Sequence, residues 1–532
     1  MASIEDLCDE LVIMIWNKLN NFDVFYSFMG VNKRFDRLVR DVSYTRSIQL
    51  FDKDSNNNDC SLPDILLDRL CFDVLPQIHD NIECLTLEPL SMERILCAAQ
   101  YSHLHKLPLV NFGHQSTRHY FTNESPFANL FKQRITHLNV SINFKLKLLL
   151  VDSNENLYAF ISSIFTNLID FNFTCHCFWR RFQHLTIDDS CNKTSFLQNV
   201  INLRIDVDTL DDCLRLLDGR LIYLRKFIVN IYRIESSTLN IGSKTLTNLR
   251  HFSLTSPKST TEYDNYVLPL LQRMINLEKL ILCLSISRRS TYIDGFHFKN
   301  QIFIHMPQLR TFDFEITTSV PRSERGNQLT NHELQNTFID ERYRQVISYI
   351  NDDRIIGSES HIFSLPYTID TSLTLTSGFP GGLLPNVRDL LLMDLRNSFD
   401  HQFFMIIAQS FPYLTDLSIH NHEQQQQYKR LNEADENNPQ LSIIEFSHLN
   451  NLRLDSSHID YAEQFLDEMN TRLPCLIHLD VSYEDLEIVT ENFTRDATRR
   501  HCAQLNRIQF YKSIVLSENF YLYFLPLNRF QL

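Results

Sequence analysis

The amino-acid sequence predicts an α/β solenoid, in which each repeat adds one strand to a parallel inner sheet and one helix to the outer side. Three observations predict this fold: a short apolar phrase recurs fourteen times, helical periodicity recurs between the phrases, and only 10 of the 532 residues are glycine. The alternative, a doubly wound α/β protein, would show more regular glycine-bearing turns between strands and helices. The apolar fraction of 43% is sufficient for a continuous core.

Each phrase is an apolar residue followed three and five positions later by two more, as in Leu277, Leu280 and Leu282. Side chains alternate along a strand, so the second and third residues of a phrase point to the same face, the predicted core. The middle residues of the phrases are Leu85, Leu107, Leu138, Phe171, Leu203, Phe227, Phe252, Leu280, Phe312, Leu390, Leu417, Leu452, Leu479 and Ile508. The phrase resembles the leucine-rich repeat, and the resemblance implies a horseshoe with a parallel inner sheet and outer helices.

The segments between phrases predict the helices, because apolar residues recur there three or four positions apart. This spacing is found in residues 210–217, 267–274 and 461–469. A lone strand-and-helix unit cannot bury its apolar face, so neighbouring units must stack.

One interval between phrases is longer than the others. Successive phrases begin 22 to 35 residues apart, except for one step of 78 residues. Residues 317–382 fall within that step and are either an insertion or degenerate repeats. In this segment we expect a helix at 332–350 and β-structure at 361–375.

The residues between the core positions of each strand should face the concave side of the sheet. Cations and anions are balanced there, and the whole chain carries a net charge of −14, which argues against binding nucleic acid by neutralising phosphates. A mixed surface suits a protein or peptide partner. The candidate partner-binding residues on this face are Lys226, His251, Lys279, Asp389, Asp416 and Arg453.

Residues 4–42 do not share the repeat pattern. Leu7, Leu11, Ile15 and Leu19 recur at four-residue steps, and residues 11–16 are all apolar, so this helix has no polar side over its middle turn. We expect a second helix capped by Asp23 and a third at 31–39. A domain of about forty residues cannot bury so much apolar surface, so we expect the side of Val12, Trp16 and Phe28 to remain exposed. The alternative is a cap on the open end of the solenoid.

The order of residues in this segment resembles the F-box, a helical module that binds an adaptor protein. The matching string is Leu7-Cys8-Asp9-Glu10-Leu11, Ile15-Trp16, Leu19, Asp23, Val31-Asn32-Lys33-Arg34-Phe35 and Leu38. Two positions depart: Cys8 replaces the usual proline, which puts the strength of adaptor binding in doubt, and Asn32 replaces the usual cysteine. The resemblance implies an F-box at residues 1–45 followed by a leucine-rich-repeat solenoid at 46–532.

This combination is similar to the substrate receptors of cullin-based ubiquitin ligases. The resemblance implies that the F-box binds a Skp-family adaptor and through it a cullin, while the repeats bind a protein substrate of unknown identity. It also implies a non-catalytic subunit without cofactor or metal. The adaptor-binding residues that it predicts are Leu7, Cys8, Leu11, Ile15, Trp16, Phe28 and Val31. The alternative is a leucine-rich-repeat scaffold without a role in ubiquitin transfer.

Other features predict a protein of the cytoplasm or nucleus. No apolar stretch is long enough to span a membrane, and the N-terminus lacks the pattern of a signal peptide. The 12 cysteines are scattered except for Cys175-His176-Cys177, which lacks the second ligand pair of a zinc site. No nucleophile or phosphate-binding motif of an enzyme is found. The run 424–438, rich in Gln and acids, is expected to be a mobile surface loop.

Overall fold

The computed structural model shows an α/β protein with a large, mostly parallel sheet. It describes residues 4–53, 59–111, 134–142, 165–175, 197–242, 244–324, 329–353, 357–369, 372–394, 396–425, 442–510 and 516–524. The chain divides into two compact units: the first contains residues 1–280 and 302–309, and the second contains 281–301 and 310–532.

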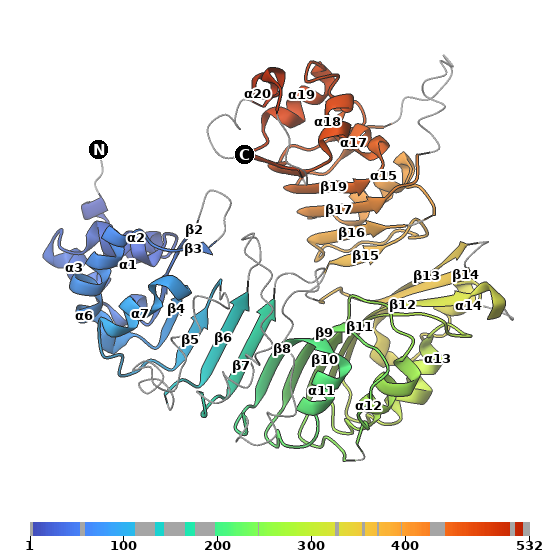
Figure 1. The fold of residues 1–532 in the computed structure, drawn as a ribbon, viewed down its shortest axis with the longest axis horizontal. Coiled ribbons are helices and arrows are strands. Elements are labelled where there is room, and N and C mark those ends of the chain that lie inside the picture. Colours follow the sequence, from blue (N-terminus) through green and yellow to red (C-terminus); the bar gives the residue numbers. More distant parts are fainter. Residues whose placement is uncertain are drawn as a thin grey trace. The chain divides into compact units, whose positions relative to one another are not determined.

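The first unit begins with short helices and continues as a ladder of parallel strands in the order β1-β4-β5-β6-β7-β8-β9-β10 (Figure 1). Its strands are β1 (Ser47–Leu50), β2 (Asp52–Lys53), β3 (Asp59–Cys60), β4 (Cys84–Leu87), β5 (Lys106–Leu109), β6 (His137–Ile142), β7 (Asp170–Cys175), β8 (Asn202–Thr209), β9 (Lys226–Arg233) and β10 (His251–Thr255).

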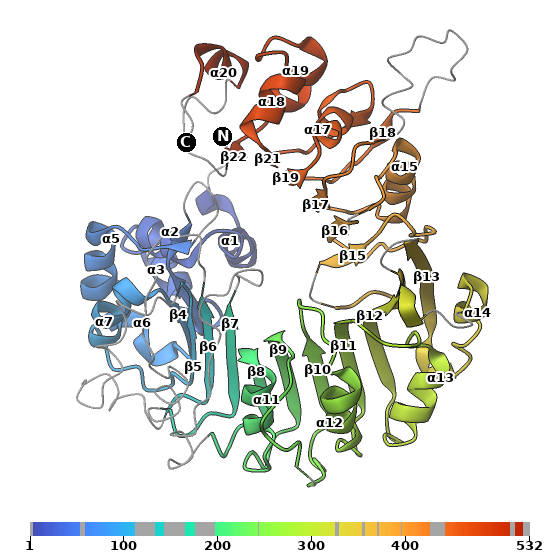
Figure 2. The ribbon, with the colours of Figure 1, turned by 45° about the vertical axis from the view of Figure 1, so that its right-hand side comes forward.

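The helices and helical turns of the first unit are η1 (Ile4–Asp6), α1 (Asp9–Trp16), α2 (Asn21–Phe28), α3 (Lys33–Val39), α4 (Val42–Thr45), α5 (Asp64–Arg69), η2 (Leu70–Val74), α6 (Leu75–Ile78), η3 (His79–Asn81), α7 (Pro89–Cys97), α11 (Leu210–Leu216), η6 (Tyr263–Val267) and α12 (Leu268–Gln272). Figure 2 shows α11 against β8 and β9, where the repeat pattern places an outer helix. No helix within the described residues is long and apolar enough to span a membrane.

The second unit contains the end of one sheet, in the order β11-β12-β14-β13, and a separate six-stranded parallel sheet, in the order β15-β16-β17-β19-β21-β22. Its strands are β11 (Lys279–Ile286, whose first two residues belong to the first unit), β12 (Thr311–Pro321), β13 (Gln345–Asp353), β14 (Gly357–Leu365), β15 (Leu373–Leu375), β16 (Asp389–Met393), β17 (Asp416–Asn421), β18 (Ile444–Glu445), β19 (Asn451–Ser457), β20 (Thr471–Arg472), β21 (His478–Asp480) and β22 (Arg507–Gln509).

The helices and helical turns of the second unit are α13 (Gly295–Phe298), η7 (Lys299–Phe303, whose last two residues belong to the first unit), η8 (Arg322–Glu324), α14 (Asn331–Gln335), η9 (Glu341–Tyr343), α15 (His401–Ser410), α17 (Ile459–Leu466), α18 (Tyr483–Val489), α19 (Asp496–Ala503) and α20 (Glu518–Tyr523). The helix expected at 461–469 corresponds to α17, which begins at Ile459 and ends at Leu466. Met469 thus lies outside the helix and is exposed.

The strands predicted from the fourteen phrases are confirmed. Every phrase carries a strand that begins one residue before its middle apolar position. Parallel pairing then aligns the phrases, as where Leu390 is the partner of Leu417 and Leu417 that of Leu452. All phrase residues are buried except Phe510, which is half-buried near the last strand. The alternation of side chains along each strand thus places the three apolar columns in the core.

The prediction of one helix after every strand fails between β9 and β10, where the described part of residues 234–250 is irregular. In place of a helix, the buried Arg273 side chain holds this irregular segment by hydrogen bonds. Its guanidinium donates to the carbonyl oxygens of Leu217 at 2.9 Å and Lys244 at 2.9 Å, and also to that of Ile241. One side chain thereby satisfies backbone acceptors from two irregular segments, which would otherwise cost free energy when buried.

The segment that interrupts the phrases differs from the expectation. The helix predicted at 332–350 ends at Gln335, and residues 345–353 form β13 instead. The physical reason is that the β-branched residues 346, 347 and 350 favour a strand over the expected helix. β13 and β14 form an antiparallel pair, and β14 is also antiparallel to β12. The β-structure expected at 361–375 is found in β14 and β15, and β15 pairs parallel to β16.

Side-chain amides cover the outer edge of β13, the last strand in its sheet. Gln335 Nε2 donates to the carbonyl oxygen of Val346 at 3.0 Å, and Asn331 Oδ1 accepts from the Ile350 N–H at 2.7 Å. Both amides come from α14, which packs along β13. An edge strand with free N–H and C=O groups would be a template for another strand, and α14 occupies two of these groups.

Candidate interaction surfaces

The N-terminal helices are delimited by asparagine caps. Asn20 Oδ1 accepts from the Phe22 N–H at 3.2 Å, and Asn32 Oδ1 accepts from the Phe35 N–H at 2.8 Å. These bonds satisfy N–H groups that the first turn of a helix leaves unpaired. The expected cap of the second helix, Asp23, lies inside the first turn of α2 instead.

An aromatic cluster forms the centre of this small helical region. The Trp16 ring lies 4.8 Å from that of Phe28, 5.7 Å from that of Phe35 and 6.1 Å from that of Tyr44, measured between ring centroids. The expectation that Val12 and Trp16 remain exposed is therefore wrong, since both are fully buried. The physical reason is that α2, α3 and α4 supply aromatic side chains that cover this side of α1.

The opposite side of α1 carries an exposed apolar stripe. Leu11, Met14 and Ile15 are 46%, 63% and 42% exposed, and Leu19 after the helix is also exposed. Spacings of three and four residues place them on one face, which we call the α1 stripe. Met14 and Leu19 were not among the predicted adaptor-binding residues, although their positions in the apolar run could have indicated them.

The other predicted adaptor-binding residues differ in exposure. Cys8 and Val31 are exposed, whereas Leu7 and Phe28 are half-buried. Cys8 has a φ of −70°, within the range that a proline ring would fix. The backbone at the position where the F-box has proline is thus compatible with that residue.

Arg34 fixes the start of α1 against α3. Its guanidinium donates to Asp9 Oδ1 at 2.7 Å, to the Glu5 carbonyl oxygen at 2.7 Å and to the Leu7 carbonyl oxygen. Arg37 adds a contact of 2.6 Å to Asp9 Oδ2. The hydrogen bond from Arg34 holds the pKa of Asp9 below its ordinary value, with Arg37 adding to the effect.

The N-terminal helices contact the first strand through α2. Asn20 Nδ2 donates to the Phe51 carbonyl oxygen at 3.1 Å, and the Gln49 N–H donates to Asn21 Oδ1 at 3.3 Å. The α1 stripe takes no part in these contacts and remains exposed.

On the first unit, three of the predicted inner-face residues lie near one another. Lys226 on β9 is the register partner of His251 on β10, and Lys279 follows at the start of β11. Burial first, and then the charges of Lys226 and Lys279, lower the pKa of His251 to about 4. The exposed Arg225 precedes Lys226. We call Arg225, Lys226, His251 and Lys279 the basic cluster.

On the second unit, the other predicted residues belong to a network of polar contacts. Asn451 Nδ2 donates to Asp416 Oδ1 at 2.7 Å, and Asn451 Oδ1 lies 2.7 Å from His478 Nδ1. Asp389 is the register partner of Asp416, so this series crosses β16, β17, β19 and β21. We call Asp389, Asp416, Asn451 and His478 the polar ladder.

Arg453 lies one step along the same strands and balances the acids of the second unit. Its guanidinium is 3.8 Å from Asp416 Oδ1 and 3.6 Å from Asp480 Oδ2. Burial raises the pKa of Asp389, the neighbouring Asp416 adds to this rise, and Arg453 opposes it. The structure therefore brings Asp389, Asp416 and Arg453 together.

Two acids on the strands, the buried Asp206 and the half-buried Glu315, were not among the residues predicted from the sequence. Asp206 on β8 accepts from the Cys175 N–H at 2.7 Å and from Asn230 Nδ2 at 2.6 Å, and burial raises its pKa to about 6. Glu315 on β12 accepts from the Tyr367 hydroxyl at 2.6 Å. Both positions continue the inner-face alternation beyond the phrase, which is the signal that could have identified them.

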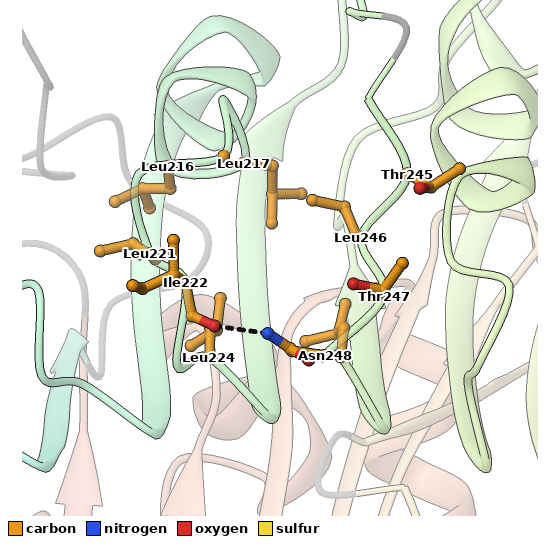
Figure 3. Close-up of a pocket in the computed structure, with 11 residues that line it drawn as sticks. Leu216, Leu217, Leu221, Ile222, Leu224, Thr245, Leu246, Thr247 and Asn248 are labelled. Carbon is orange, nitrogen blue, oxygen red and sulfur yellow. Dashed lines mark hydrogen bonds between the residues drawn. The ribbon is translucent and has the colours of Figure 1, made fainter.

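A pocket of about 130 Å³ opens beside the end of α11 in the first unit (Figure 3). Leu216, Leu221 and Leu246 contribute to its walls, and Asn248 Nδ2 donates to the Ile222 carbonyl oxygen at 2.7 Å. No titratable side chain of the described residues lines it. The pocket, which Thr245, Thr247 and Asn248 line together with the leucines, therefore lacks the paired ionisable groups of an acid-base site.

Other sequence features lie wholly or partly outside the described residues. Of Cys175-His176-Cys177, only Cys175 is described, at the end of β7. Within the described part of the chain, no three His, Cys, Asp or Glu side chains are placed to hold a metal ion. The expected loop at 424–438 lies outside the described residues from 426 onward.

Comparison with known proteins found no family model and no curated protein that matches this chain.

Proposed function

We propose that this protein is the substrate receptor of a cullin-based ubiquitin ligase. Its N-terminal helices act as an F-box that binds a Skp-family adaptor, and its strands form a leucine-rich-repeat solenoid that holds a protein substrate. The protein performs no chemistry of its own and increases the rate of ubiquitin transfer by raising the effective concentration of the substrate. It acts in the cytoplasm or nucleus.

The observation that carries this proposal is the exposed α1 stripe. Leu11 and Ile15 match apolar positions of the F-box string, and both are exposed on a helix whose other side is already buried against aromatic residues. An apolar face of this kind, left over after the core is complete, is characteristic of a surface that binds another protein. The capping alternative uses α2, which already contacts β1, and leaves the α1 stripe without a purpose.

The repeats support the second half of the proposal. Parallel pairing aligns neighbouring phrases within each of the two sheets, so that inner-face side chains of paired strands lie next to each other at about 4.8 Å intervals. Such an array is a broad surface, and its mixed charge suits a protein. A leucine-rich-repeat scaffold outside ubiquitin transfer would use the same face and would not need the α1 stripe.

The test is binding of the purified full-length chain to a purified Skp-family adaptor. The double variant Leu11→Asp/Ile15→Asp should lose roughly 100-fold or more in affinity, because two carboxylates would be buried without partners. The matched control is Ile65→Asp/Phe72→Asp, which changes two apolar side chains that are 80% and 77% exposed on α5 and η2. It should bind as the wild type does.

Thermal unfolding of both variants checks that the fold is intact. If the wild type fails to bind the adaptor, or if the α1 variant binds equally well, the protein is not an F-box receptor. The scaffold alternative would then be preferred.

A further inference from the structure

A cavity of about 320 Å³ lies in the second unit, beside the start of β13. Three stretches of the chain line it: the start of β13, the end of β14 with the residues that follow, and the segment before β16. Leu365, Leu383 and Leu384 form part of its apolar wall, and Gln345 and Asn386 contribute side-chain amides. Pockets for ligands typically range from roughly 300 to 1,000 Å³, so this cavity suits a small group.

Among the described residues, Arg344 is the only charged side chain that lines this cavity. Its guanidinium makes no ion pair or hydrogen bond with any residue that the structure describes. Two residues earlier, Arg342 is neutralised, since its guanidinium donates to the two carboxylate oxygens of Asp340 at 2.7 Å and 2.6 Å. The contrast between these two arginines leaves the positive charge of Arg344 available to a ligand.

The backbone of Arg344 also points to a role for its side chain. Its φ of 55° lies in the left-handed region, which favours glycine and which other residues rarely adopt. The preceding turn η9 fixes this conformation, because Tyr343 is buried and its hydroxyl donates to the Gly295 carbonyl oxygen. Glycine would fit this backbone better than arginine does. Local strain of this kind is characteristic of ligand-binding sites.

The groups that line the cavity define the chemistry of its ligand. A guanidinium presents N–H donors in a planar fork that matches the two oxygens of a carboxylate. Gln345 and Asn386 are exposed, and a side-chain amide both donates and accepts hydrogen bonds. The leucines offer only apolar contact. A matching ligand therefore combines a carboxylate, an amide and an apolar group, and the C-terminal residue of a polypeptide carries all three.

We propose that this cavity binds the C-terminal residue of the protein substrate, with the α-carboxylate on Arg344 and an apolar side chain against Leu365 and Leu384. This inference deepens the proposed function and rests on it, since it takes the ligand to be a protein. An internal aspartate or glutamate brings a carboxylate without the apolar side chain. An internal leucine brings the side chain without the charge, so only a chain end satisfies both parts of the cavity.

The test is fluorescence anisotropy of the full-length chain, without adaptor, with short N-terminally labelled peptides that end in leucine, methionine or phenylalanine. The wild type should bind a peptide with a free C-terminal carboxylate and should bind its amidated form roughly tenfold more weakly. Arg344→Gln should lower the affinity for the free-acid peptide by a similar factor and leave the affinity for the amidated peptide unchanged.

The matched control is Arg472→Gln, which removes an exposed arginine of β20 outside the cavity and should bind as the wild type does. A second variant, Arg344→Gly, separates binding from folding. Glycine tolerates the positive φ, so thermal unfolding should show an intact fold, whereas the affinity for the free-acid peptide should still fall.

Three results would overturn the proposal: equal binding of free-acid and amidated peptides, no binding of any free-acid peptide by the wild type, or no loss in Arg344→Gln. Competition with phenylacetate identifies the source of the carboxylate. We expect phenylacetate to displace the peptide only weakly, because it has no peptide amide. Displacement at a concentration no higher than that of the unlabelled free-acid peptide would assign the cavity to a small apolar acid instead.

The result is separable from the adaptor experiment. Leu11→Asp/Ile15→Asp should bind the free-acid peptide normally, and Arg344→Gln should bind the adaptor normally. A wild type that binds the adaptor but no peptide overturns only the docking proposal. A wild type that binds the peptide but no adaptor overturns the receptor proposal.

Discussion

The basic cluster of the first unit and the polar ladder of the second occupy the same position within their repeats, yet they differ in how their polar groups are satisfied. In the ladder, Asn451 joins Asp416 to His478 by two short hydrogen bonds. In the cluster, Lys226 has no such partner among the described residues, and burial, with the lysine charge adding to it, lowers the pKa of His251. The difference teaches that an inner-face residue can be held by its neighbours in one unit, while in the other unit a residue at the same repeat position has no such contact with the described residues.

Breaking the polar ladder should have the largest effect on stability. Asn451→Leu leaves Asp416 and His478 without their shared partner, and we expect a loss of about 2 to 3 kcal/mol in the free energy of unfolding. Urea denaturation of the second unit's transition measures it. The matched change in the first unit, Lys226→Met, should shift stability by less than about 0.5 kcal/mol, because it removes no internal bond. A similar loss in both variants would contradict the comparison.

Acid should weaken the first unit through His251, with a somewhat smaller effect. The folded-state pKa of about 4 lies below the ordinary value of 6.5, so this contribution is present above pH 6.5 and is lost as the pH falls toward 4. Allowing for solvent screening, the contribution is about 2 kcal/mol. Lys226→Met should raise the pKa of His251 part of the way back, since burial remains. NMR titration of the His251 ring measures this, and an unchanged pKa would refute the role of the lysine.

Removing the cation of the second unit should have the smallest effect. Arg453→Met should cost about 0.5 to 1 kcal/mol near neutral pH, because the guanidinium is partly exposed and its ion pairs are long. The cost should be smaller at pH 4, because burial raises the pKa of the neighbouring Asp389 and so makes this acid easier to neutralise than an ordinary Asp. Chemical denaturation at both pH values tests this, and a larger cost at pH 4 would contradict it.

Much of the fold could be predicted because the phrase reports one physical requirement, the burial of three columns of side chains. Two strands that pair with phrase strands lack part of this pattern: β1 was not predicted, and β15 was expected only as part of the β-structure at 361–375. β1 contains Ile48 and Leu50, but its first position is Thr45, a polar residue that is nevertheless buried. β15 has Leu373 and Leu375 but an acid at position 370. β1 pairs with β4, and β15 pairs with β16, through tertiary contacts that the phrase alone does not predict.

The candidate sites were less predictable for a different reason. Residues 11–16 are all apolar, so the sequence gives no indication of which side of α1 is buried. The aromatic rings of Phe28, Phe35 and Tyr44 decide this by covering Trp16. Likewise, the inner-face charges are balanced overall. Only the side-chain contacts distinguish Arg453, which lies near two acids, from Lys226, which has no ion pair among the described residues.

The amides of α14 along β13 have a consequence for how the molecule is assembled. A parallel repeat array has no inherent length limit, since every strand can receive another. Gln335 and Asn331 act as a terminator at the last strand of one sheet, and β15 then begins the six-stranded sheet with a register of its own. The strand register of the repeats before this terminator need not match that of the repeats after it, so evolution can change the two registers separately, while the core that Tyr349 shares with Leu373 still couples the side chains of the two sheets.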